Sequence, residues 1–201
     1  MLHDKEISQW VLENISNEYE FIGPIAKFIS NICEFGLLWL LIMIALMVYY
    51  YLKNKKINFY FLIVLVPIFL TWCICEFYLK NVNIRIRPFE AIEEFKQYMD
   101  AINYAYPKGY SFPSGHCVVA FGSAYTLAKF NKKYAPYAFV LAILVAFSRL
   151  VIGAHYLSDI IAGIGFGLAA GAIGCAIADY LNPKIMSRIY NKETKTKNEV
   201  R

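Results

Sequence analysis

Charged residues are scarce in this sequence, and its cysteines follow no pattern that builds a disulfide framework or a metal site. Only 17% of the 201 residues are charged, while 59% are hydrophobic, a composition outside the range of ordinary soluble domains. The five cysteines are odd in number and irregular in spacing, so a disulfide framework is not expected. Cys73 and Cys75 lack the spacing and the partner cluster of a zinc site. We therefore expect the cysteines to be small buried hydrophobic side chains.

The first residues lack the positively charged start that marks a secretory signal peptide. They carry instead a set of acidic residues: Asp4, Glu6, Glu13, Glu18 and Glu20. Residues 5–15 have one apolar helical face, formed by Ile7, Trp10, Val11 and Ile15. This segment is expected either to lie on the membrane surface or to pack against the rest of the protein. No internal repeat or low-complexity segment is present, and the length fits one domain.

The hydrophobic residues lie in long runs, which is typical of an integral membrane protein. A bilayer core of roughly 30 Å needs about 20 helical residues. By this measure we expect five spans, at 36–52, 58–79, 115–130, 134–153 and 157–181. The first and third are short. Five such runs leave too little polar surface for the alternative, a soluble helical bundle. The predicted fold is therefore an all-α membrane bundle with a single domain over 1–201, an N-terminal surface segment at 1–31 and a basic cytoplasmic tail at 183–201.

Basic residues gather in three segments that five alternating spans place on one side of the membrane. Twelve of the 20 Lys and Arg residues lie there: Lys53, Lys55 and Lys56; Lys129, Lys132 and Lys133; Lys184, Arg188, Lys192, Lys195, Lys197 and Arg201. This side is predicted to be the cytoplasm of a cell that holds the protein in its plasma membrane. The tail is expected to meet anionic lipid headgroups or solvent, and no nucleic-acid partner is predicted.

The opposite side collects ionisable and turn-forming residues at the ends of spans. They lie in "KNVNIRIRPF" (Lys80, Arg87, Pro88), "FPSGHC" (Pro113, Ser114, Gly115, His116) and "SRLVIGAHYLSD" (Ser148, Arg149, His155, Asp159). Taken singly, Lys80 and Arg87 are explained as interface anchors and Ser114 as a helix N-cap. Arg149 and His155 are explained as interface loop residues, and Asp159 as a partner of a helix dipole. Their gathering on one face of one membrane favours a functional site.

These residue types suit the binding of a phosphate group. A helix that begins after Ser114 turns the backbone N–H groups of Gly115 and His116 toward an anion. Three cations, Lys80, Arg87 and Arg149, would add charged donors and complete a phosphate cradle.

The same residues suit phosphoryl transfer. His155 and Asp159 are four residues apart, and a carboxylate bonded to one imidazole nitrogen would expose the other nitrogen as a nucleophile. His116 is placed to act as a general acid or base. No cluster of carboxylates with metal-ligand character accompanies them.

The three segments together resemble the signature of the type-2 phosphatidic acid phosphatase (PAP2) superfamily. The matching blocks are Lys80-x6-Arg87-Pro88, Pro113-Ser114-Gly115-His116 and Ser148-Arg149-x5-His155-x3-Asp159. The resemblance implies that Lys80, Arg87, Arg149, Ser114 and the Gly115 amide hold the phosphate. It also implies that His155 attacks phosphorus to form a phosphohistidine and that Asp159 orients His155. His116 would protonate the leaving group and then help to activate water, with no metal or other cofactor. Many bacterial members have six spans, whereas five are predicted here.

Two features outside these blocks carry hypotheses of their own. Glu76 lies four residues before Lys80, the favourable order for a helical ion pair, and it either orients Lys80 in the site or only makes both charges tolerable in the membrane. Residues 89–106 have apolar side chains at helical spacing. They are expected to form an amphipathic helix that either shapes access for a lipid or simply covers the bundle.

The resemblance implies a lipid phosphate as substrate and membrane lipids as partners. Undecaprenyl diphosphate is the substrate expected first, and phosphatidylglycerophosphate, phosphatidic acid and diacylglycerol pyrophosphate are the alternatives. Vanadate-dependent haloperoxidases share the motif, but five spans argue against that soluble class. A non-catalytic lipid-binding protein is disfavoured because His116, His155 and Asp159 are all present. A transporter is disfavoured because its binding site is expected near mid-bilayer. The sequence carries no signal for an oligomeric state.

Overall fold

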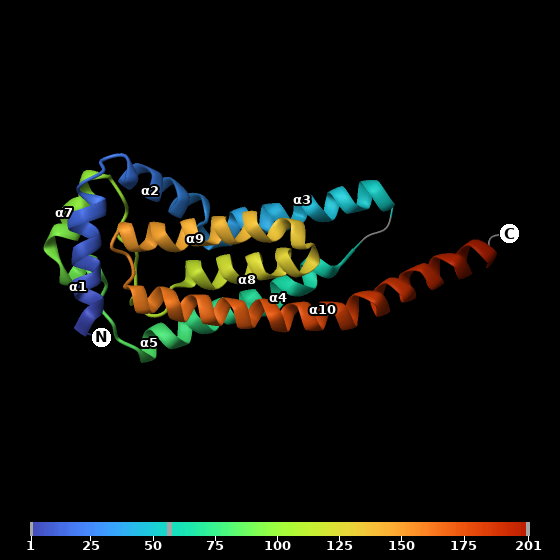
Figure 1. Cartoon of the computed structure of the whole chain (residues 1–201). Helices are drawn as coiled ribbons and strands as arrows, with labels where there is room; N and C mark the ends of the chain where they lie inside the picture. The colour runs from blue at the N-terminus through green and yellow to red at the C-terminus, as the bar shows by residue number, and fades with distance from the viewer. Residues whose placement is uncertain (1, 56–57, 200–201) are drawn as a thin grey trace.

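The structure, a computed structural model, describes the backbone of residues 2–55 and 58–199, together with the side chains in this part except those of Leu2, Phe35 and residues 186–199. Lys56 and Arg201 lie outside the described residues. No β-strand occurs in the part of the chain that is described. The long helices run side by side as an elongated bundle, and the C-terminal part of the last helix extends beyond it (Figure 1). The predicted all-α fold is confirmed.

The bundle is built from five helical runs that follow the hydrophobic runs of the sequence. They are α3 (Leu37–Asn54), α4 (Tyr60–Cys73) with the π-helix η3 (Ile74–Leu79) and α5 (Lys80–Val82), α8 (Gly115–Phe130), α9 (Ala135–Val151) and α10 (Leu157–Glu199). Within the described residues, four stretches are long and apolar enough to cross a membrane: Leu37–Asn54, Tyr60–Val82, Lys132–Val151 and Leu157–Ile185. The remaining helix, α8, has only 16 residues, in agreement with the short third span predicted at 115–130.

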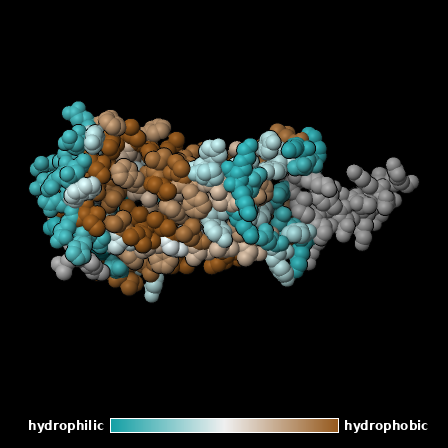
Figure 2. Space-filling view, in the orientation of Figure 1, coloured by the Kyte–Doolittle hydropathy of each residue, from teal (hydrophilic) through white to brown (hydrophobic). Residues whose placement is uncertain are grey.

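On the face that Figure 2 shows, an apolar band covers the middle of the molecule and lies between two hydrophilic regions. Many large hydrophobic side chains of this band are exposed, among them Phe28, Leu41, Phe69, Val140 and Ile161. In water such a surface would be very unfavourable, whereas in a bilayer it contacts lipid chains. The chain is therefore a multi-pass membrane protein.

The short α8 lies at the centre of the bundle because glycines let α10 approach it closely. A Cβ atom on Gly163, Gly167 or Gly171 would lie 2.6, 2.5 or 2.7 Å from the carbonyl oxygens of Ser114, Val118 and Gly122, respectively. These three glycines are four residues apart, so they lie on one face of α10. Such small residues are common where membrane helices approach each other closely.

Replacement of Gly167 by Ala is expected to destabilise the bundle, because the new methyl group would collide with the Val118 carbonyl, 2.5 Å away. Overpacking of this kind costs about 1–3 kcal/mol, which exceeds the gain of up to about 1 kcal/mol from replacing a helical glycine. Gly165 is the matched control, since a Cβ there meets nothing within 4 Å. Thermal unfolding in detergent should show a melting temperature lowered by several degrees for Gly167→Ala only. Equal shifts in both variants would contradict close packing of α8 on α10.

Shorter helices cap one end of the bundle, where α1 (Leu2–Val11) and η1 (Leu12–Ser16) lie near α6 (Pro88–Ala91) and α7 (Glu93–Ala101) (Figure 1). They share a small apolar core that includes Val11, Leu12, Phe89, Phe95 and Met99. Of the two placements left open for residues 5–15, the structure thus shows packing against the bundle. The amphipathic pattern of 89–106 forms helices only as far as Ala101. Beyond it, residues 104–106 are not helical.

The N-terminal part continues along the bundle through α2 (Ile22–Ile32) and the turn η2 (Glu34–Gly36) into α3. Gly36 adopts φ +73°, and a Cβ there would lie 2.7 Å from Val119 of α8, so this break in the helix requires glycine. The predicted basic loops lie at the opposite end from α1 and α7 (Figure 1). The assignment of that end to the cytoplasm, like the surface segment 1–31 and the tail 183–201, stays a prediction.

Candidate active site

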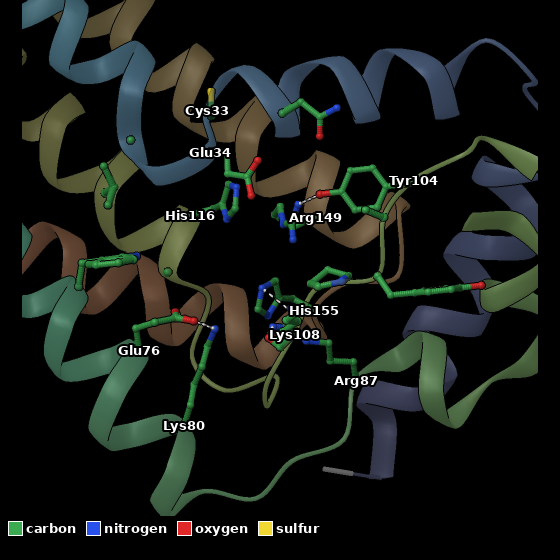
Figure 3. Close-up of a pocket in the computed structure, with 18 residues that line it drawn as sticks. Cys33, Glu34, Glu76, Lys80, Arg87, Tyr104, Lys108, His116, Arg149 and His155 are labelled. Carbon is green, nitrogen blue, oxygen red and sulfur yellow. Dashed lines mark hydrogen bonds and ion pairs between the residues drawn. The ribbon is translucent and has the colours of Figure 1, made fainter. Parts of the chain in front are cut away.

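A cavity of about 430 Å³ lies where the α2–α3 break, α4–α5, α8, α9 and the loop after α7 meet. Seven predicted site residues line it (Figure 3): Glu76, Lys80, Arg87, Gly115, His116, Arg149 and His155. All of them except Glu76 belong to the three sequence blocks, which meet here because each block lies at a helix end on the same side of the bundle. Ser114, Asp159, Pro88, Pro113 and Ser148 do not line the cavity. Of these, Pro88 begins α6, and the hydroxyl of Ser148 donates to the Val145 carbonyl within α9.

His155 is held in the turn between α9 and α10 with one nitrogen committed to the backbone. Its Nδ1 atom lies 2.7 Å from the carbonyl oxygen of Ser111. Because a carbonyl only accepts hydrogen bonds, Nδ1 carries the proton and Nε2 keeps its lone pair. Burial, followed by the positive charges of Arg87, Arg149 and Lys80, lowers the pKa of His155 well below its ordinary value. The imidazole is therefore neutral near pH 7, and Nε2 keeps the lone pair that a nucleophile needs.

Asp159 does not contact His155 in the way that we expected. The closest approach is 3.8 Å, between Nδ1 and Asp159 Oδ2, which is longer than a hydrogen bond. The carboxylate instead accepts hydrogen bonds from the Ser111 hydroxyl and from the backbone N–H of Tyr156. The expected direct bond is thus replaced by an indirect link, in which Ser111 lies between the two residues. Asp159 begins the buried face of α10 and is fully buried.

The two arginines of the cavity are buried and held by neutral oxygen atoms. Arg87 donates to the carbonyls of Gly109, Ala154 and Lys108 at 2.9, 2.8 and 3.1 Å. Its Nη1 also lies 3.4 Å from His155 Nε2. Burial, and then the charge of Arg149, lower the pKa of Arg87 to about 10, so it stays charged at neutral pH. Since none of these partners neutralises its charge, an anion bound in the cavity would be strongly attracted.

Arg149 lies at the end of α9 and donates from Nη1 to the hydroxyl groups of Ser30 and Tyr104. Lys80 faces it across the cavity and is paired with Glu76 through both carboxylate oxygens, at 2.8 and 2.7 Å (Figure 3). The helical ion pair predicted from the Glu76–Lys80 spacing is therefore present. Whether Glu76 orients Lys80 for function stays a prediction.

Three polar atoms of the predicted site are buried without a hydrogen-bond partner: Ser114 Oγ, His116 Nε2 and Arg149 Nε. Ser114 occupies the N-cap position of α8, but its side chain makes no capping bond. Orphaned buried polar groups are rare and call for a missing partner. An oxyanion near the N-terminus of α8 would supply one for His116 and Arg149, which line the cavity.

Sequence reasoning missed four residues that hold the site: Ser30, Arg85, Tyr104 and Ser111. Ser30 and Tyr104 fix Arg149, while Ser111 and Arg85 hold Asp159. The only signal in the sequence for Arg85 and Ser111 was their position within or next to the recognised blocks. Ser30 and Tyr104 lie 119 and 45 residues from Arg149, and no local pattern marks them. Among the described residues, no group of three His, Cys, Asp or Glu side chains is placed to hold a metal ion.

Comparison with known proteins agrees with this geometry. Lipid A 4'-phosphatases from Bacteroides thetaiotaomicron and Porphyromonas gingivalis are each 29% identical, over 56% and 66% of this chain. The chain spans only 51% and 58% of their lengths. The crystal structure of a transmembrane PAP2-type phosphatidylglycerolphosphate phosphatase from Bacillus subtilis has the same fold, with a TM-score of 0.65, 20% identity and coverage of 88% of this chain and 84% of that one. The PAP2 superfamily model matches residues 60–183, which hold all three sequence blocks, and the chain belongs to this superfamily.

Proposed function

We propose that this chain is a membrane phosphatase that hydrolyses a phosphate ester or diphosphate of a lipid. One observation carries the proposal: the unprotonated Nε2 of a neutral His155 lies at a cavity lined by Lys80, Arg87 and Arg149. This arrangement joins a nucleophile to a cradle for the group that it would attack. Family membership supports the same class of reaction.

The residues divide the reaction into two steps. In the first, the lone pair of His155 Nε2 forms a bond to phosphorus and the bond from phosphorus to the leaving oxygen breaks. His116, protonated when the phosphate anion is bound beside it, gives that oxygen a proton and becomes neutral. In the second, neutral His116 takes a proton from water as the water oxygen attacks the phosphohistidine, which releases phosphate and restores His155. The cations hold the non-bridging oxygens throughout, where negative charge is concentrated. No step in this scheme requires a metal ion.

The cavity also has an apolar side that supports a lipid substrate. Trp72 of α4 and Val119 of α8 line it beside the cations. The charged groups thus lie within reach of a headgroup whose chains remain in the bilayer. We propose undecaprenyl diphosphate, hydrolysed to undecaprenyl phosphate and phosphate on the outer side of the plasma membrane. Phosphatidylglycerophosphate and phosphatidic acid are the alternatives, and the names of the relatives add lipid A phosphate.

The proposal predicts phosphate release by the purified protein in detergent with EDTA present. The substrates are undecaprenyl diphosphate, phosphatidylglycerophosphate, phosphatidic acid and lipid A, each at matched mole fraction in the micelle. We expect the highest kcat/KM with undecaprenyl diphosphate, by about tenfold or more if the second phosphate adds one charge-assisted contact. If another lipid gave a higher kcat/KM, that lipid would replace undecaprenyl diphosphate as the proposed substrate. Release from none of them by a folded protein would favour a non-catalytic lipid-binding protein.

A further inference from the structure

A chain of hydrogen bonds leads from His155 toward the N-terminal helix. The imidazole bonds to the Ser111 carbonyl, the Ser111 hydroxyl donates to Asp159 Oδ2, and Asp159 Oδ1 accepts from Arg85 Nη1 at 2.5 Å. Backbone bonds follow the same path, since Ser111 N–H donates to the Arg85 carbonyl at 2.8 Å and Ser114 N–H donates to the Asp159 carbonyl at 3.1 Å. The position of the imidazole therefore depends on how the Asp159 carboxylate is held.

Arg85 is fixed by several partners and points away from the phosphate cradle. Besides Asp159, its guanidinium donates to Ser158 Oγ at 2.7 Å and to Asp4 Oδ2 at 2.8 Å, and it lies 4.2 Å from the centre of the Tyr156 ring. The side chain is 16% exposed, and it does not line the cavity. A planar guanidinium joins such a set of acceptors in a geometry that a lysine ammonium does not reproduce.

Asp4 brings the N-terminal helix α1 into this network. Its carboxylate accepts from the Ser158 backbone N–H at 3.2 Å and from the Ser158 hydroxyl at 2.7 Å, as well as from Arg85. Burial alone would raise the pKa of Asp4, but hydrogen bonds from Ser158 and Arg85 outweigh it, and the pKa is lowered. Asp4 is therefore a carboxylate at neutral pH. It accepts from Arg85 Nη2 near the start of α10, where α1 crosses the end of the bundle (Figure 1).

We infer that Arg85 is a positioning residue for His155 and that Asp4 holds Arg85 in place. Arg85 balances the charge of the fully buried Asp159, which would otherwise be an uncompensated carboxylate. Asp159 in turn accepts a hydrogen bond from the Ser111 hydroxyl and so fixes the Ser111 carbonyl that binds the imidazole. The inference rests on the proposed function, because the orientation of His155 matters only if His155 reacts. It extends the machinery to α1, which lies outside all three sequence blocks.

Steady-state kinetics test this inference, with the substrate that is hydrolysed fastest among the four lipids named above. A shift of a reacting group by about 1 Å costs about 100-fold in rate, so Arg85→Gln is expected to lower kcat about 100-fold. Arg85→Lys should lose about tenfold and Asp4→Asn about fivefold, since each keeps part of the network. KM and the inhibition constant of inorganic phosphate should stay within about twofold, because the cradle is intact. The control is Lys96→Gln, which breaks only an exposed 3.9 Å pair with Glu93 on α7 and should leave kcat unchanged.

Wild-type kcat in Arg85→Gln would overturn the inference. So would a loss of kcat accompanied by an equal weakening of phosphate inhibition, since that pattern indicates a damaged cradle. If Arg85→Gln elutes as an aggregate in size-exclusion chromatography, Asp4→Asn decides, and wild-type kcat in that variant overturns the inference. Absence of turnover by the wild-type protein would refute the proposed function and the inference with it, an outcome distinct from a variant that equals an active wild type.

Discussion

Replacement of His155 by Asn is expected to lower kcat by about 10⁴-fold or more, because loss of the nucleophile disables the whole reaction. Asn is chosen because its amide N–H can donate to the Ser111 carbonyl, as His155 Nδ1 does at 2.7 Å. The variant therefore removes Nε2 while keeping the hydrogen bond that holds the residue in its turn. Inhibition by inorganic phosphate is expected to remain, since the three cations are untouched.

His3 provides the matched control for this substitution. It is the histidine outside the site, with a side chain that is 87% exposed and pairs with Glu6 on α1. His3→Asn should retain full kcat with the same lipid in the same detergent. Substantial activity in His155→Asn, at more than about one hundredth of the wild-type rate, would show that another residue or water itself attacks phosphorus.

Replacement of Arg149 by Lys has the second largest expected effect, a loss of kcat/KM of about 100- to 1000-fold. Arg149 Nη1 is occupied by Ser30 and Tyr104, while its Nε is buried without a partner. The guanidinium can therefore bind the protein and an oxyanion at the same time. A lysine has a single nitrogen on a flexible stem and cannot meet both demands in this geometry.

Tyr104→Phe separates the two tasks of Arg149. It removes one acceptor of the guanidinium, at 2.6 Å, but leaves the charge and Nε in place. A loss of about tenfold is expected from this variant, because one hydrogen bond from the charged guanidinium is removed while Ser30 still accepts from the same nitrogen. The measurement is kcat/KM together with the inhibition constant of inorganic phosphate, which should rise in Arg149→Lys. Activity of Arg149→Lys within threefold of the wild type would contradict a phosphate-binding role for Arg149.

The helices of this protein follow from local patterns in the sequence. The run from Gly115 to Phe130 matches α8 at both ends because a Pro-Ser-Gly turn and a polar Asn131 bound it. The second span runs three residues further than predicted, to Val82, because Glu76 neutralises Lys80 and lets the helix continue through a buried charge. Hydrophobic spacing also predicted a helix within 89–106, but it did not reveal that this segment forms two helices, Pro88–Ala91 and Glu93–Ala101.

The meeting of the cavity residues could be predicted from the order of the spans as well as from the motifs. Each block ends or begins a helix on one side of an alternating bundle, so the sequence predicts that Lys80, His116 and His155 meet. The support of His155 was not predictable in the same way. Its Nδ1 bonds to a backbone carbonyl, which no side-chain pattern reveals. Arg85 bonds to Asp4 across 81 residues, and a contact so distant in sequence appears only when the helices are packed.

The most direct test of the account uses inorganic phosphate and water enriched in ¹⁸O, with EDTA present and no lipid. If His155 forms a phosphohistidine, the second step can run in reverse. His155 Nε2 then bonds to the phosphorus of inorganic phosphate, and one phosphate oxygen leaves as water. Mass spectrometry should then detect ¹⁸O entering phosphate with the wild-type protein and with His3→Asn, but not with His155→Asn. Hydrolysis of a lipid phosphate by the wild-type protein without any such exchange, or exchange that persists in His155→Asn, would contradict a covalent role for His155.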